Sequence, residues 1–162
     1  MNDVTCAIRR ATWVDQAAIG ALVQGERLNP NDLDWRRFIV AENASGVVGA
    51  VQLRPHEDDA HELGTLVVRS DARGRGIASR MIDNVLTSAA GRVLMITGAA
   101  FAAHYARWGF HPIEPARAPM GVQRNYYFGR IFGWAMWLAG SRRPRPLAIF
   151  DRQPVTRVQA AM

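Results

Sequence analysis

The sequence predicts a mixed α/β fold in one domain of moderate size. The chain has 162 residues, of which 49% are hydrophobic, which is enough for one well-buried core. Short β-branched stretches alternate along it with stretches whose apolar residues recur at helical spacing. Residues 67–80 show both patterns, because a strand-like run leads through a turn with two glycines into an amphipathic segment. We therefore expect a single domain over residues 1–151, followed by a tail over residues 152–162.

The first half of the chain reads as one helix among several strands. Apolar and polar residues alternate from Val4 to Ile8, which predicts a first strand. Thr12 followed three residues later by Asp15 is typical of a helix start, and apolar residues then recur at helical spacing as far as Leu22. Further strands are expected at residues 38–42, 47–53 and 62–69. The turn residues 43–46 predict a hairpin between the first two of these, and the acidic residues 57–59 a solvent-facing loop before the third.

The second half predicts helices separated by single strands. Apolar residues at helical spacing indicate a helix over residues 77–89, a strand over 93–97 and a short helix over 100–108. A largely apolar helix over about 124–139 and a last strand over 146–151 follow. Because a helix needs about 20 apolar residues to cross a bilayer, this one is too short to span a membrane. We expect it to pack on the sheet or on a second subunit, with contact to a membrane surface as the alternative.

The glycine turn before residue 77 has the composition of a phosphate-binding site. The first turn of a helix leaves backbone N–H groups without partners and carries a partial positive charge. Gly74 and Gly76 allow the backbone to approach an anion closely, and Arg73, Arg75 and Arg80 add positive charge nearby. The sequence therefore predicts a cofactor that bears phosphate groups.

Two common phosphate-binding motifs are excluded. A P-loop requires a lysine, and this chain contains none. The dinucleotide-binding fingerprint requires a third glycine where Ser79 stands.

The spacing that does fit is Arg73-x-x-Gly76-x-Ala78. It resembles the acetyl-CoA signature of the GNAT superfamily of N-acetyltransferases. Residues 104–110, His-Tyr-Ala-Arg-Trp-Gly-Phe, resemble a second segment of that superfamily, with His104 in place of its phenylalanine. The two motifs come in the family's order, and the resemblance covers roughly residues 4–114. It implies a mostly antiparallel sheet that is splayed between strands 4 and 5 and flanked by helices on both faces.

The resemblance also implies the roles of individual residues. Tyr105 matches the family tyrosine that protonates the departing thiolate, and Glu62 is the best candidate for the base that accepts the proton of the amine. His61 is the competing base, but it points to the other face of the strand. A strand carboxylate can equally be only a surface residue, and many family members use ordered water alone. The residues expected to hold acetyl-CoA are Leu66, Val67, Val68, Arg73, Gly74, Arg75, Gly76, Ile77, Ala78 and Ser79.

The acceptor of the acetyl group stays open, between a small amine and a protein amine. The loop after the first helix lines the acceptor site in the family, which makes Asn29, Asp32 and Trp35 the candidate substrate-binding residues. No metal is expected, since His56, Asp58, Asp59 and His61 match no standard ligand spacing.

The net charge and the cysteine content limit which partners and which cellular compartment the sequence allows. The net charge of +6 comes from 20 arginines against 14 acidic residues and suits an anionic cofactor. A single cysteine and an N-terminus without a signal-peptide pattern predict a cytoplasmic protein. The sequence leaves two alternatives to an N-acetyltransferase, namely a non-catalytic acyl-CoA sensor and a phosphate- or nucleic-acid-binding module. The nucleic-acid-binding module lacks a recognition motif in this sequence, so no nucleic acid is expected as a partner. A homodimer through the apolar C-terminal helix is possible.

Overall fold

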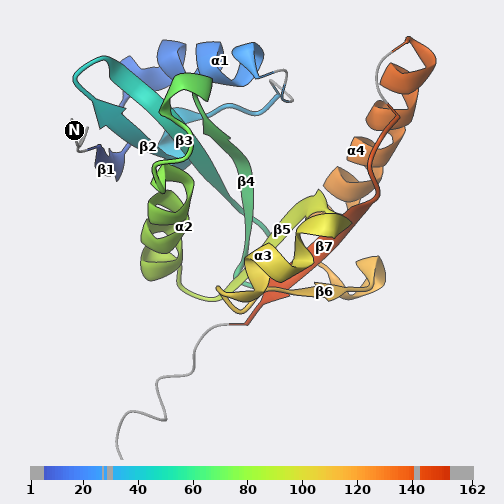
Figure 1. Ribbon diagram of the computed structural model, residues 1–162. Coiled ribbons are helices and arrows are strands. Elements are labelled where there is room, and N and C mark those ends of the chain that lie inside the picture. Colours follow the sequence, from blue (N-terminus) through green and yellow to red (C-terminus); the bar gives the residue numbers. More distant parts are fainter. Residues whose placement is uncertain (1–5, 27, 29–30, 141–142, 154–162) are drawn as a thin grey trace, which may run out of the picture. The chain divides into compact units, whose positions relative to one another are not determined.

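The computed structural model describes residues 6–26, 28, 31–140 and 143–153. Two compact units make up the chain (Figure 1). The first contains the described parts of Met1–Arg54 and Leu63–Ser88, and the second those of Pro55–Glu62 and Ala89–Met162.

Antiparallel strands form the sheet of the first unit. Its strands are β1 (Ala7–Arg10), β2 (Phe38–Asn43), β3 (Gly46–Pro55) and β4 (Ala60–Val68), side by side in that order. Pro55 at the end of β3, the loop that follows and the first residues of β4 as far as Glu62 belong to the second unit. β1 and β2 pair antiparallel, as do β2 and β3. The hairpin turn between β2 and β3 lies where the sequence predicts it. There the Asn43 side-chain oxygen accepts a bond of 2.8 Å from the Ser45 backbone N–H, and Gly46 has a positive φ of 98°.

Helices cover both faces of this sheet. They are α1 (Gln16–Gly25) and α2 (Ile77–Ser88), with single 3-10 turns at Trp13–Asp15, Trp35–Arg37 and Ser70–Ala72. Successive residues of β3 point to opposite faces of the sheet. Ala50 packs in the cluster that holds Ile19 and Val23 of α1, whereas a Cβ on the adjacent Gly49 would lie 3.0 Å from Cε of Met81 in α2. The helix expected to start after Thr12 thus begins with one 3-10 turn.

The second unit repeats this layered arrangement. Its strands are β5 (Arg92–Gly98), β7 (Leu147–Arg152) and β6 (His111–Ile113), antiparallel and in that spatial order. Its helices are α3 (Ala102–Ala106) and α4 (Met120–Leu138), with 3-10 turns at Ala99–Phe101 and Pro115–Arg117. On β7, Ile149 packs in the cluster that holds Val122 and Tyr126 of α4, while the ring of the adjacent Phe150 faces Tyr105 of α3.

The expected mixed α/β fold, with a mostly antiparallel sheet flanked by helices, is confirmed. The helix expected over residues 100–108 is shorter, because its first turn is 3-10 and the chain turns at Gly109, whose φ is 81°. The splay between strands 4 and 5 and the single domain over residues 1–151 stay predictions. Within the described residues, no helix is both long and apolar enough to cross a membrane.

Candidate functional site

The glycine turn that precedes α2 has the geometry of an open backbone cradle. Gly74 and Gly76 have φ values of 77° and 71°, a conformation that favours glycine. A Cβ built on either glycine would meet no atom within 4 Å, so the space over the turn is open. The first helical hydrogen bond runs from the Arg80 N–H to the Gly76 carbonyl at 3.1 Å, which places the start of the helix directly at this opening.

Arg73 and Arg75 are held close to the glycine turn by hydrogen bonds to nearby backbone carbonyls. Arg73 Nε donates to the Val68 carbonyl at 2.9 Å, and its guanidinium pairs with the Glu26 carboxylate. Arg75 is exposed and makes a long bond of 3.4 Å to the Asp71 carbonyl. Arg80 differs from the expectation, because its guanidinium donates to the Cys6 carbonyl at 2.7 Å and is held at the start of β1.

The strand residues expected to bind acetyl-CoA lie immediately before this turn. Val67 is buried in the core of the first unit, while Leu66 and Val68 on either side of it are partly exposed. Thr65 has a φ of 48°, so the strand departs from regular geometry one residue after Gly64.

Tyr105 lies on α3 in the second unit. Its ring packs against Phe110 and Phe150, with centroid distances of 6.5 and 6.4 Å. Burial raises the pKa of the Tyr105 hydroxyl, and a hydrogen bond with the Thr97 side chain opposes that rise only in part. The hydroxyl therefore keeps its proton at neutral pH and can donate it.

Glu62 is the other candidate catalytic residue, and it is a buried carboxylate. It is 3% exposed, which rules out the alternative of a surface strand residue. Its Oε2 accepts a hydrogen bond of 2.7 Å from the Asn125 side-chain amide and lies 3.0 Å from His56 Nε2. No local sequence pattern points to Asn125. The acidic residues 57–59 are exposed, as the sequence predicts, whereas the neighbouring His56 side chain is largely buried.

His61, the competing base, is partly exposed. Its Nδ1 atom is buried and has no hydrogen-bond partner in the part of the chain that the structure describes. Adjacent strand residues point to opposite faces, so His61 and Glu62 occupy different surroundings.

The candidate acceptor-binding residues lie in the first unit. Asp32 forms ion pairs with Arg37 at 2.9 Å and Arg54 at 3.5 Å, and its own φ is 60°. Trp35 packs against the core cluster beside α1, and the Arg36 guanidinium lies 4.8 Å from its ring centroid. Asn29 lies outside the described residues. No group of three or more metal-ligating side chains occurs among the residues that the structure describes.

The sequence matches known acetyltransferases over its central part. Residues 34–112 match the family model described as an acetyltransferase (GNAT) domain. Mycothiol acetyltransferase of Rhodococcus jostii is 33% identical over 85 residues, and that of Rhodococcus opacus is 31% identical over 86 residues. These matches cover 52% and 53% of this chain but 28% of each relative, so the chain spans well under half the length of these relatives.

Solved structures extend the likeness to the fold of almost the whole chain. N-acetylglutamate synthase of Neisseria gonorrhoeae, complexed with coenzyme A and N-acetyl-glutamate, gives a TM-score of 0.74 at 17% identity. That match covers 96% of this chain and 36% of the synthase chain. A Mycobacterium tuberculosis protein in complex with CoA gives 0.68 at 25% identity, covering 92% of this chain and 99% of that one. Residues 34–112 are thus similar to a GNAT acetyltransferase domain, and the fold of almost the whole chain is similar to that of proteins solved with CoA.

Proposed function

We propose that the chain is an N-acetyltransferase that transfers the acetyl group of acetyl-CoA to a primary amine, with both substrates bound together. The observation that carries the proposal is the open turn of Gly74 and Gly76 at the start of α2. Backbone N–H groups at such a turn suit a pyrophosphate. The similar structures of Neisseria gonorrhoeae and Mycobacterium tuberculosis proteins were solved with CoA, which supports this choice of ligand.

The proposed chemistry forms a bond between the amine nitrogen and the acetyl carbon and breaks the bond between that carbon and sulfur. Glu62 accepts the proton that the amine loses, through a water molecule. The Val68 backbone N–H stabilises the negative charge that develops on the thioester oxygen. The Tyr105 hydroxyl, which its environment keeps protonated, donates a proton to the departing thiolate.

Calorimetric titration tests the cofactor part of the proposal. Acetyl-CoA, CoA and dephospho-CoA are titrated into the wild type, the Gly76→Trp variant and the Gly46→Trp variant. Gly46 is the matched control, because it also has a positive φ and open space around a Cβ but lies in the hairpin between β2 and β3. Binding that Gly76→Trp abolishes and Gly46→Trp retains supports the proposal. A wild type that binds none of these at millimolar concentration overturns it and favours the nucleic-acid alternative.

The acceptor is the second unknown of the proposal. Release of the CoA thiol from acetyl-CoA is followed with L-glutamate, other amino acids, a small alkyl amine and a peptide with a free N-terminus. Glutamate is included because one structural relative is an N-acetylglutamate synthase. Binding of acetyl-CoA without thiol release with any amine would instead support the non-catalytic sensor.

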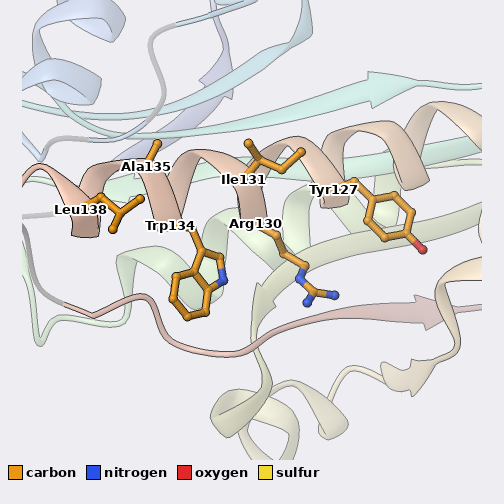
Figure 2. Close-up of a pocket in the computed structure, with 6 residues that line it drawn as sticks. All are labelled: Tyr127, Arg130, Ile131, Trp134, Ala135 and Leu138. Atoms are coloured by element: carbon orange, nitrogen blue, oxygen red, sulfur yellow. The ribbon is translucent and has the colours of Figure 1, made fainter.

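A homodimer and a cytoplasmic location complete the proposal. On α4, Tyr127, Ile131, Trp134 and Leu138 are exposed, and they line a surface cavity of about 570 Å³ together with Arg130 and Ala135 (Figure 2). Exposed apolar surface of this kind favours association with a second copy. Sedimentation equilibrium of the wild type and of Ile131→Glu tests the dimer, since a buried glutamate at its centre would return the variant to a monomer.

A further inference from the structure

The loop between β3 and β4 is anchored on the first turn of α4. Its own backbone closes through a hydrogen bond of 2.8 Å from the His56 N–H to the Ala60 carbonyl. The Glu57 carboxylate accepts a bond of 3.1 Å from the Gly121 N–H, one of the groups that a helix start leaves without a partner. The loop and the helix start are therefore held together within the second unit.

The imidazole of His56 lies directly on this helix start. A Cβ added to Gly121 would stand 2.3 Å from His56 Nδ1 and 2.8 Å from Cε1, well inside contact distance. Only a glycine leaves room for the ring at that distance. The His56 side chain is 9% exposed, so its position is set by packing rather than by solvent.

The other edge of the ring meets Glu62. His56 Nε2 lies 3.0 Å from Glu62 Oε2, and the side-chain amide of Asn125 donates to the same oxygen at 2.7 Å. In the ionised form that the proposed base requires, the Glu62 oxygen only accepts hydrogen bonds, so His56 Nε2 carries the hydrogen in this contact. Asn125 follows Gly121 by four residues and thus lies on the same face of α4.

We infer that His56 and Asn125 are positioning residues for Glu62, which they hold by one oxygen in the orientation needed to accept the proton of the amine. This inference rests on the proposed function, in which Glu62 is the base. A buried carboxylate needs hydrogen-bond donors to offset its desolvation, and two fixed donors on one oxygen also fix the plane of the group. The glycine at position 121 is what allows one of these donors to approach.

The inference predicts which kinetic constant changes. A displaced base slows the chemical step but leaves acetyl-CoA bound as before, so kcat falls while the KM for acetyl-CoA is unchanged. His56→Leu removes the donor and keeps an apolar side chain in the buried site. His56→Gln keeps a donor at the distance of Nε2, and we expect it to restore most of the rate.

A double-mutant cycle tests whether His56 acts through Glu62. Thiol release from acetyl-CoA is measured with the best amine of the acceptor panel for the wild type, His56→Leu, Glu62→Gln and the double variant. We expect His56→Leu to lower kcat by about 10- to 100-fold and to have no further effect once Glu62 is replaced. Asn125→Leu should behave in the same way, with a loss of about tenfold.

Controls separate this role from a general loss of structure. His111→Leu replaces an exposed histidine of β6 in the same unit and should leave the rate unchanged. Thermal denaturation and the Kd for acetyl-CoA are measured for every variant. Equal and independent losses from His56→Leu and Glu62→Gln, or a His56→Gln variant as slow as His56→Leu, would overturn the inference while the proposed function stands. A wild type that releases no thiol with any amine overturns the proposed function, and the inference with it.

Discussion

The Arg9 guanidinium holds both carboxylate oxygens of Asp15 within the first unit. Its Nη1 donates to Oδ2 at 2.8 Å and its Nη2 to Oδ1 at 2.9 Å. Oδ2 also accepts a bond of 2.7 Å from the Thr12 backbone N–H, so the ion pair secures the chain at the 3-10 turn before α1. The contact with Arg9, helped by the Thr12 N–H, holds the pKa of Asp15 far below its ordinary value of 3.8.

Asp15→Asn should therefore destabilise the protein in a pH-dependent way. We expect the free energy of unfolding at pH 7 to fall by about 2 kcal/mol, because a nearly buried ion pair is broken. The pKa of Asp15 is lower in the folded state than in the unfolded state, so its contribution is complete above about pH 4 and is lost as the pH falls below that. Urea denaturation at pH 7, 5 and 3 should show the gap to the wild type narrowing only at the last pH.

Asp58→Asn is the matched control for this prediction. Asp58 lies exposed in the loop before β4, in a left-handed conformation that asparagine also tolerates. The free energy of unfolding of Asp58→Asn should differ little from that of the wild type at pH 7, 5 and 3. A gap for Asp15→Asn that stays constant from pH 7 to pH 3 would contradict the electrostatic explanation.

Alanine at two helical glycines should change the stability in opposite directions. Gly121→Ala places a Cβ 2.3 Å from the buried ring of His56 and should lower the free energy of unfolding by about 1–3 kcal/mol. Gly20→Ala, inside α1 with no atom within 4 Å of its Cβ, should raise it by about 0.5–1 kcal/mol. Thermal and urea denaturation of both variants measure the difference. A Gly121→Ala variant as stable as Gly20→Ala would show that the loop does not press on α4.

The sequence predicts the elements whose signals are local. The apolar spacing of Ile77, Met81 and Val85 predicts α2, and all three are buried; the turn residues 43–46 likewise predict the β2–β3 hairpin. The setting of Glu62 could not be predicted in this way, because its partner Asn125 stands 63 residues further along the chain. Asparagine on an apolar helix has no periodic signature that would reveal a buried hydrogen bond.

The contacts of Arg80 and Gly121 could not be predicted for the same reason, because they involve distant parts of the chain. Spacing along the chain puts Arg80 next to the glycine turn, but its long side chain reaches the Cys6 carbonyl 74 residues away in sequence. Gly121 stands at a helix start, where most residues are tolerated, and only the approach of His56 shows why glycine is there. Contacts between distant segments decide both cases, and no local pattern records them.

The turn before α2 should show its backbone strain when glycine is replaced. Gly76 has a φ of 71°, and a Cβ there meets no neighbour within 4 Å. Gly76→Ala should therefore cost about 1 kcal/mol of unfolding free energy through strain alone. Gly76→Asn should cost less, because asparagine adopts this conformation more readily although it is larger. Denaturation curves of the two variants decide between strain and bulk: a larger loss for asparagine would point to a steric clash at the turn.

Tyr105→Phe tests the proposed proton donor. The variant keeps the ring that packs on Phe110 and Phe150, so its thermal stability should stay close to that of the wild type. Thiol release should slow by about 100-fold at neutral pH, because the departing thiolate loses its proton donor. Since burial raises the pKa of Tyr105 above its ordinary 10.0, deprotonation of this group should reduce the wild-type rate only above about pH 10. The control is Tyr127→Phe on the exposed face of α4, where the rate should not change. Equal rates for Tyr105→Phe and the wild type would leave water as the proton donor and remove Tyr105 from the mechanism.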